Sequence, residues 1–388
     1  MSPAAWSRTT HGIDDATPGH GHRVLSDFLV INYPKGRHVQ QEQQREPFSF
    51  SGNGGEYFRI WIVNLCLSIL TLGIYSAWAK VRRLQYFYRH TAVAGASLDY
   101  HGDPIAILKG RIFAVLLFGG YSLVANIHPV AGLGIFALIL LIMPWLLVRS
   151  LRFQMHNTSY RGLRFSFHGK TGDAYVNFLL LPLVSYMSLG FLWPLAHQQM
   201  TQYIRRHSAY GNGEFGFDGK TGAFYKPYMV LFGVTLLLLA VAIGLGVVIA
   251  KGWMPQGQTG DPDQSVFMGF VFVIIGFFYL SLLLFAVPYL TARLQNLIWN
   301  HTTLGPLGFA CHLRARELFG LMFTNLLLIV LTLGLFKPFA DIRMARYRVE
   351  HMTLLANEDL DGFVAAQQAS VSASGEEMAD IFDMDISA

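Results

Sequence analysis

The sequence predicts a mainly α-helical, polytopic membrane protein with short β-strands on its cytoplasmic side. Of its 388 residues, 53% are hydrophobic and 14% are charged, whereas soluble domains carry about 25% charged residues. Apolar runs approach or reach the roughly 20 residues that a spanning helix needs. About seven such runs occur, at 58–78, 112–127, 130–148, 174–193, 228–250, 266–290 and 318–336. A strand-like pattern that occurs five times adds the β component.

Three regions differ in composition. Residues 1–46 are polar and lack an apolar segment followed by a cleavage site, so we expect a mobile arm rather than a signal peptide. Residues 47–356 form a single membrane domain. Residues 357–388 carry eight acids and no Lys or Arg, which indicates an acidic tail that either stays disordered or docks on a protein partner or on this chain's own basic surface. Near its end, a short stretch rich in Asp and Glu also contains Met378, Ile381, Phe382 and Ile386.

Metal, cofactor and catalytic motifs give no positive signal. The arm's histidines could bind a metal, but they have no fixed spacing, so no metal site is predicted; they are His11, His20, His22 and His38. Cys66 and Cys311 are the only cysteines and indicate neither a disulfide framework nor zinc binding. The chain has no phosphate-binding loop, nucleophile elbow, HExxH or CxxC, so no cofactor is predicted and an enzyme has no support. Asp99, His101 and Asp103 would share one face of a strand and could act as acids and bases. However, turn chemistry before a proline explains Asp103 without catalysis.

Five segments alternate apolar and small or polar residues, and the first four of them end in a glycine. They are residues 48–52, 98–102, 165–169, 215–219 and, in a degenerate form, 307–311. Period-two alternation closed by a turn residue is typical of a short strand. Because strand edges cannot face lipid, we expect these strands to pair with one another at one membrane face. Isolated amphipathic linkers are the alternative.

Three units of the chain share one pattern, an apolar helix, a small-residue bend and a polar helix. The bend glycines, which we interpret as hinges, are Gly73, Gly190 and Gly334. These glycine-bend units cover about 47–96, 162–213 and 305–356, and two apolar helical hairpins, at about 97–161 and 214–304, separate them. The hairpins supply four firm spans. The chain is therefore predicted to be built by internal repetition.

Each polar helix carries a tyrosine and a histidine thirteen and seventeen residues after its glycine. These residues are Tyr86 and His90, Tyr203 and His207, and Tyr347 and His351. Together with an alanine they lie on one stripe of a helix. The stripe either presents a ligand-binding or proton-relay surface to a shared chamber or packs the helices against the strands. Asn64 and Asn325 lie inside apolar helices and must face protein or a cavity. The middle unit has Leu181 at this position.

Basic residues cluster beside the strands, whereas the hairpin tips carry only Lys251. The positive-inside rule therefore places the tips outside and the strands in the cytoplasm. The glycine-bend units then either re-enter on the cytoplasmic side or span the membrane in alternating directions. The basic body predicts contact with the bilayer and its anionic lipid headgroups, and no nucleic-acid partner.

Residues 48–111 closely resemble the YjgN family of bacterial inner-membrane proteins, which carries a domain of unknown function. The resemblance rests on FSFSGNGGEYFRIWIVN, LTLGIYSAWAKVRRLQYFYRHT and LDYHGDPIAILKGR, and continues more weakly to about residue 355. It implies a multi-pass inner-membrane location and brings no substrate or catalytic residue. The leading hypothesis for function is a transporter- or channel-like protein for a small solute or lipid. The alternative is a non-transporting scaffold or sensor that binds anionic lipid or a partner protein through its basic face.

Overall fold

The structure is a computed structural model and describes residues 44–253, 264–356 and 360–372. The chain divides into Met1–Gln41 and Glu42–Ala388, and all described residues belong to the second unit. The four arm histidines lie outside the described residues, as do Met378, Ile381, Phe382 and Ile386 of the acidic tail. The predicted arm overlaps the fold at its end, because strand β1 begins at Gln44.

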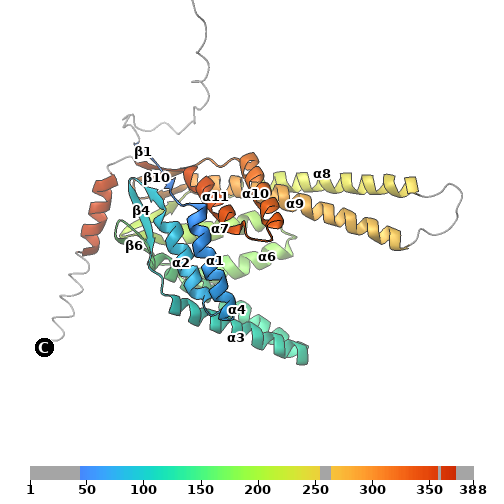
Figure 1. Cartoon of the computed structure of the whole chain (residues 1–388), viewed down its shortest axis with the longest axis horizontal. Coiled ribbons are helices and arrows are strands. Elements are labelled where there is room, and N and C mark those ends of the chain that lie inside the picture. The colour runs from blue at the N-terminus through green and yellow to red at the C-terminus, as the bar shows by residue number, and fades with distance from the viewer. Residues whose placement is uncertain (1–43, 254–263, 357–359, 373–388) are drawn as a thin grey trace, which may run out of the picture. The chain divides into compact units, whose positions relative to one another are not determined.

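An antiparallel sheet organises the described residues, which are otherwise mostly helical (Figure 1). Its strands are β1 (Gln44–Pro47), β2 (Ser49–Phe50), β3 (Thr91–Val93), β4 (Ala96–Tyr100), β5 (Thr158–Tyr160), β6 (Leu163–Phe167), β7 (Ser208–Tyr210), β8 (Gly213–Phe217), β9 (Thr302–Leu304), β10 (Leu307–Cys311) and β11 (Met352–Ala356). Their order in the sheet is β1-β11-β10-β9-β8-β7-β6-β5-β4-β3-β2. From β2 to β11, strands that follow one another in the chain are thus neighbours in the sheet.

The sheet closes on itself into a barrel. Its two terminal strands, β1 and β2, are consecutive parts of the chain separated only by Phe48. Phe48 N donates to Met352 O of β11 at 3.0 Å, and Ser51 N donates to His90 O at 3.0 Å beside β3. One continuous segment therefore pairs with β11 on one side and with β3 on the other. Closure leaves no free strand edge, which is the usual solution to the edge problem in antiparallel sheets.

All five segments with the alternating pattern lie in strands of this sheet, namely β2, β4, β6, β8 and β10. Their partners β3, β5, β7, β9 and β11 were not predicted. Four of these partners have only three residues, too few for a period-two pattern to be recognised. Each follows a helix directly, so helical periodicity runs up to its first residue.

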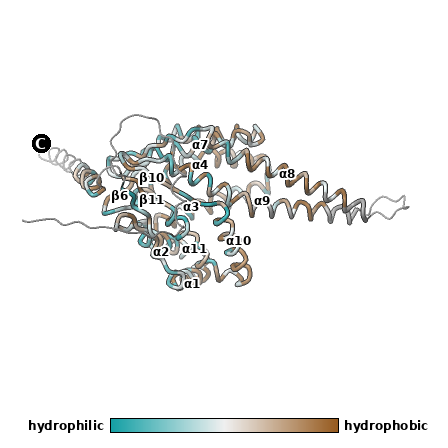
Figure 2. Tube along the Cα trace, turned by 90° about the horizontal axis from the view of Figure 1, so that it is seen from above, coloured by the Kyte–Doolittle hydropathy of each residue, from teal (hydrophilic) through white to brown (hydrophobic). Residues whose placement is uncertain are grey.

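Between successive pairs of strands, the chain leaves the sheet as helices and returns to it. The helical elements are α1 (Gly54–Leu70), α2 (Ser76–Arg89), α3 (Pro104–Ile127), α4 (Pro129–His156), α5 (Thr171–Tyr175), η1 (Val176–Leu180), α6 (Leu181–Met187), α7 (Trp193–Arg206), α8 (Thr221–Trp253), α9 (Gln264–Asn300), α10 (Ala315–Leu331) and α11 (Lys337–Glu350). The strands on either side of each excursion pair with each other, as β4 does with β5. Each excursion is therefore a helical hairpin rooted in the sheet, and α8 and α9 lie side by side as a largely apolar pair (Figure 2).

Three helices in the described residues are long and apolar enough to cross a membrane. They are Pro104–Ile127, Pro129–His156 and Thr221–Val248. All three belong to the two hairpins, for which four firm spans were predicted; seven spans are not confirmed, and the three glycine-bend units are not among the candidates. The apolar runs of the glycine-bend units are divided by their bends, and the 17 residues of α1 or α10 extend only about 26 Å at 1.5 Å per residue. The hydrocarbon core is about 30 Å thick.

Each bend places a leucine and then a glycine at positive φ. The pairs are Leu72 and Gly73 (51° and 91°), Leu189 and Gly190 (54° and 85°), and Leu333 and Gly334 (50° and 94°). In the first bend, Tyr75 N donates to Thr71 Oγ1 at 2.9 Å, and Ser188 and Thr332 accept in the same way in the other two. As a result, every backbone N–H of residues 71–76, 188–193 and 332–337 donates within its own bend.

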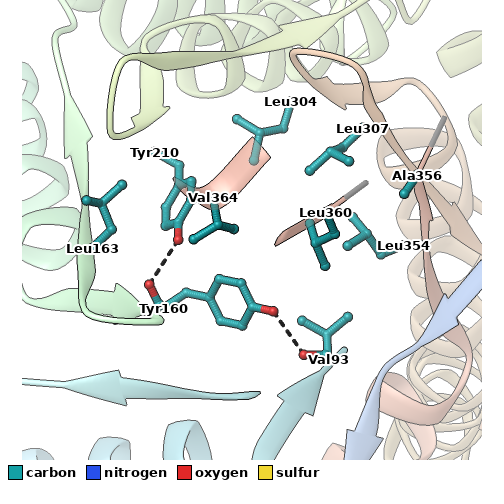
Figure 3. Close-up of a cluster of buried hydrophobic side chains, with 10 residues drawn as sticks. All are labelled: Val93, Tyr160, Leu163, Tyr210, Leu304, Leu307, Leu354, Ala356, Leu360 and Val364. Atoms are coloured by element: carbon teal, nitrogen blue, oxygen red, sulfur yellow. Dashed lines mark hydrogen bonds between the residues drawn. The ribbon is translucent and has the colours of Figure 1, made fainter. Parts of the chain in front are cut away.

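The main hydrophobic core lies inside the barrel (Figure 3). Its side chains come from β3, β5, β6, β7, β9, β10 and β11 and from a helix at residues 360–372. Leu360 and Val364 of that helix are buried against the strands, and Arg161 in the β5–β6 turn forms an ion pair with Asp361. The first part of the predicted acidic tail thus covers the end of the barrel where the strand turns lie, a contact that the sequence interpretation did not assign to these residues.

Candidate functional site

The Tyr/His stripes lie at the junction between the helices and the barrel, and the side chains of each stripe form their hydrogen bonds within their own unit. Tyr86, Tyr203 and Tyr347 belong to three different side-chain clusters rather than to one shared chamber. Each tyrosine hydroxyl instead bonds to the backbone at the start of the preceding helix. Tyr86 donates to Asn53 O at 3.0 Å, Tyr203 to Lys170 O at 2.8 Å, and Tyr347 to Arg314 O at 3.2 Å.

The histidines end their helices. In His90, His207 and His351 the ring Nδ1 lies 2.7–2.8 Å from the carbonyl oxygen four residues earlier, which requires Nδ1 to carry the proton. The carbonyl of each histidine accepts the N–H of the residue that follows the neighbouring strand, as Ser51 N does to His90 O. Asn157 and His301 occupy the same position at the ends of α4 and α9 and make both kinds of bond. These contacts join helix to barrel at five places.

Glu56 and Glu317 contact the Tyr/His stripes, and we did not predict them as site residues from the sequence. The carboxylate of Glu56 accepts from the Tyr86 hydroxyl at 3.2 Å, and Glu317 accepts from Tyr347 at the same distance. The neighbouring histidine Nε2 atoms lie 3.9 and 3.7 Å from these carboxylates. The signal was available, because each acid precedes its bend glycine by seventeen residues.

Asp99, His101 and Asp103 each bond to a different partner. Asp99 accepts from Arg89 Nε at 2.8 Å and from Tyr100 N at 2.7 Å. Burial has the largest single effect on this carboxyl and raises its pKa, but these hydrogen bonds and the charge of Arg89 together leave the pKa lowered. His101 bonds to Ser159 Oγ, and Asp103 caps the N-terminus of α3. Within the part of the chain that the structure describes, no three His, Cys, Asp or Glu side chains gather as metal ligands.

A groove of about 750 Å³ lies between the first and third glycine-bend units and is the strongest candidate site. It is lined by α1, α2, α11 and the start of α3. Five cations but one carboxylate line it, so we call it the cationic groove. These residues are Lys80, Arg83, Arg111, Lys337, Arg348 and Asp341. Asp341 pairs with Lys337 at 2.7 Å and Arg83 at 3.5 Å. Three cations therefore line the groove without a carboxylate partner among the described residues.

The rest of the groove wall is largely apolar and aromatic, with Tyr57, Trp61, Leu84 and Phe87 among its residues. The sequence reasoning counted most of these cations as topology signals and missed that they converge. The spacing of residues within one helix could have indicated which of them share a face. Lys80, Arg83 and Phe87 follow an i, i+3, i+7 pattern, which places them on one face of α2. No sequence pattern, however, pairs α2 with α11 across some 260 residues.

Asn64 lines the cationic groove and its side-chain oxygen, although buried, has no hydrogen-bond partner. Its counterpart Asn325 differs, because Asn325 Oδ1 accepts from Arg343 at 2.8 Å. In the first unit, the residue that corresponds to Arg343 is Arg82, whose guanidinium lies 5.8 Å from the Tyr75 ring centroid instead. A buried acceptor without a donor is costly. Asn64 Oδ1 is therefore a buried acceptor beside the groove, without a donor among the described residues.

Comparison with known proteins identifies the family. Residues 45–381 match the family described as bacterial protein of unknown function, DUF898. This match includes much of the acidic tail, which the resemblance seen in the sequence did not cover. Inner membrane protein YjgN of Salmonella typhimurium is 23% identical over 362 residues, covering 80% of this chain and 88% of that protein. YjgN of Escherichia coli K12 is 33% identical over 150 residues, covering 37% of this chain and 36% of that protein. No solved structure matches.

The family match covers most of the chain, and the relatives are inner-membrane proteins by name. The apolar helices agree with that location. The chain therefore belongs to the DUF898 family, which it shares with the YjgN proteins, and is an inner-membrane protein.

Proposed function

We propose that the protein is transporter-like and moves an anionic lipid headgroup along the cationic groove. Three cations without a carboxylate partner suit a phosphate-bearing headgroup, and the free Asn64 oxygen suits a hydroxyl or amine donor on it. The aromatic and apolar wall suits the acyl chains of a lipid better than a fully hydrated solute. An amphipathic groove of this kind matches an amphipathic substrate.

The depth of the cations is the observation that carries the proposal. Lys80 and Lys337 lie near the bends of their units, Arg83 lies further along α2, and Arg348 lies near the sheet. Lys337 and Arg348 are eleven residues apart on α11, about 16 Å along the helix axis. That is roughly half the thickness of the hydrocarbon core. A static headgroup anchor needs cations at one depth only, whereas a path for a headgroup needs them at successive depths.

The proposed topology puts the sheet in the cytoplasm and the helical hairpins in the bilayer. Each helical hairpin begins and ends at the barrel, so one barrel can lie on one side of the membrane. The basic helix ends beside the barrel favour the cytoplasmic side. The glycine-bend units then re-enter, because both of their ends are rooted in the same sheet.

Translocation of a fluorescent phosphatidylglycerol in proteoliposomes tests the proposal. Dithionite bleaches the outer leaflet, so movement from the inner leaflet appears as further loss of fluorescence. We expect the full chain to accelerate this loss and the double variant Lys80→Gln, Arg83→Gln to reduce the rate at least ten-fold. Arg82→Gln is the matched control, because Arg82 lies on the same helix but over Tyr75 and outside the groove.

A rate equal to that of protein-free liposomes would refute translocation. In that case, retention of phosphatidylglycerol by the purified protein, lost in the double variant but kept in Arg82→Gln, would favour the scaffold or sensor hypothesis instead.

A further inference from the structure

A second cavity, of about 260 Å³, lies inside the barrel and is separate from the cationic groove. We call it the barrel cavity. Strand side chains form its wall, the helix at residues 360–372 covers one end through Leu360, Phe363 and Val364, and the C-terminal ends of α2, α4, α7 and α9 line the other. Native interiors rarely contain voids larger than a water molecule. A cavity of this size inside a closed sheet is therefore a feature that calls for a function.

Apolar and aromatic side chains form most of the wall of the barrel cavity. Phenylalanines from three alternate strands, β6, β8 and β10, stack along it, with the rings of Phe165 and Phe215, and of Phe215 and Phe309, 6.3 Å apart. The two tyrosines drawn in Figure 3 turn their hydroxyls to the strand backbone rather than to the cavity. Tyr160 donates to Val93 O at 2.9 Å, and Tyr210 donates to Tyr160 O at 3.0 Å. An engineered apolar cavity of about 150 Å³ already binds benzene.

Arg205, near the end of α7, is the one charged residue that lines the barrel cavity among the described residues. Its guanidinium lies 4.1 Å from the ring centroid of Trp299, on α9. No carboxylate of the described residues forms an ion pair with it. Burial lowers the pKa of Arg205 to about 10, so the side chain remains charged at neutral pH. Arg205 is half-buried, and withdrawing a cation from water is costly unless an anion pairs with it.

The cavity and the cation together define the ligand. We propose that the barrel cavity binds a single-chain amphiphile with an anionic head, its acyl chain among the stacked phenylalanines and its head on Arg205. The volume is below the roughly 300–1,000 Å³ of drug-sized sites, which favours one chain over a two-chain phospholipid. Arg205 lies at the helix end of the barrel, so the head faces the membrane side and the chain points toward the helix at residues 360–372.

Equilibrium binding of radiolabelled dodecanoate and dodecanol to the full chain in phosphatidylcholine nanodiscs tests this proposal, with protein-free nanodiscs as the blank. We expect saturable binding of dodecanoate at least ten-fold tighter than binding of dodecanol. Arg205→Gln is expected to lose this ten-fold preference while still binding dodecanol, which shows that the variant is folded. Arg206→Gln is the matched control, because the next residue is exposed and lies outside the cavity. Leu98→Trp, which fills the cavity, is expected to weaken both ligands at least ten-fold.

The head chemistry is resolved by competition. A twelve-carbon lysophosphatidic acid and unlabelled dodecanoate compete for the same site, and the tighter competitor identifies a phosphate or a carboxylate head. Three results would overturn the proposal. They are no saturable binding above the blank, an unchanged preference for dodecanoate in Arg205→Gln, and equal binding by Leu98→Trp. None of these depends on translocation along the cationic groove, so the two proposals fail separately.

Discussion

Asn64 and Asn325 illustrate how one residue type serves two roles at equivalent places in the chain. Both are buried amides in the first helix of a glycine-bend unit. Asn325 is bonded to the guanidinium of Arg343, and hydrogen bonds to charged groups contribute roughly 1.5–3 kcal/mol. Asn64 Oδ1 has no such bond among the described residues, and Asn64 lines the cationic groove. The two asparagines therefore differ in whether an arginine side chain donates a hydrogen bond to the amide oxygen.

We predict opposite results for the two leucine variants. Asn325→Leu removes the acceptor of Arg343 and is expected to lower the free energy of unfolding by roughly 1–2 kcal/mol. Asn64→Leu removes an acceptor that has no donor and is expected to leave stability unchanged or slightly higher, yet to slow phosphatidylglycerol translocation. Denaturation by SDS titration measures the first quantity and the proteoliposome assay the second. Equal destabilisation by both variants would contradict the distinction.

The bend is the element that sets the glycine-bend units apart from ordinary helical hairpins. A leucine in the left-handed region costs roughly 1–2 kcal/mol, yet all three bends have one there. These leucines are 95%, 89% and 94% exposed. Irregular backbone at membrane depth must satisfy its own polar groups, and the N–H groups of all three bends are satisfied internally. An exposed apolar tip with no free N–H suits the bilayer better than water.

The third unit provides a matched pair of glycines for testing the bend. Gly334 has φ +94° and Gly320 lies within α10, and an added Cβ would meet nothing within 4 Å at either position. Gly334→Ala is expected to lower the free energy of unfolding by more than about 1 kcal/mol, because alanine is strained at this φ. Gly320→Ala is expected to raise it by up to about 1 kcal/mol. SDS titration of both variants measures the difference, and a loss at Gly320 as large as at Gly334 would show that steric crowding, not backbone strain, is responsible.

At the scale of the whole molecule, the closed barrel is the root of every helical hairpin in the described chain. An enclosed apolar void costs ~24 cal/mol per Å³ when nothing fills it. The barrel cavity of about 260 Å³ is partly open, so it carries only part of that cost, and a ligand that fills it is expected to stabilise the barrel.

Single cysteines test which side of the membrane the barrel occupies. In a Cys66→Ala, Cys311→Ala background, we place one cysteine at Ser97 or Glu214, which are exposed in the sheet, or at Asn126, near the tip of the α3–α4 hairpin. Because all strands belong to one barrel, Ser97 and Glu214 are expected to react with an impermeant maleimide only after permeabilisation. Asn126 is expected to react in intact cells. Opposite labelling of Ser97 and Glu214 would exclude a barrel on one side of the membrane.

The sequence by itself determined the features that depend on composition and on local residue patterns. Apolar runs made this a helical membrane protein, period-two alternation located β2, β4, β6, β8 and β10, and the glycines marked the bends at which the chain reverses. These features depend on residues near one another in the chain, which local patterns report. Only the tertiary structure decided that the strands close through β1 and β2, that Lys80 and Arg348 share a groove, and that Arg205 lines an apolar cavity. Each of these features depends on contacts between segments that are far apart in the sequence. Closure of the sheet and side-chain packing decide which segments meet, and the local periodicity of the sequence does not report such contacts.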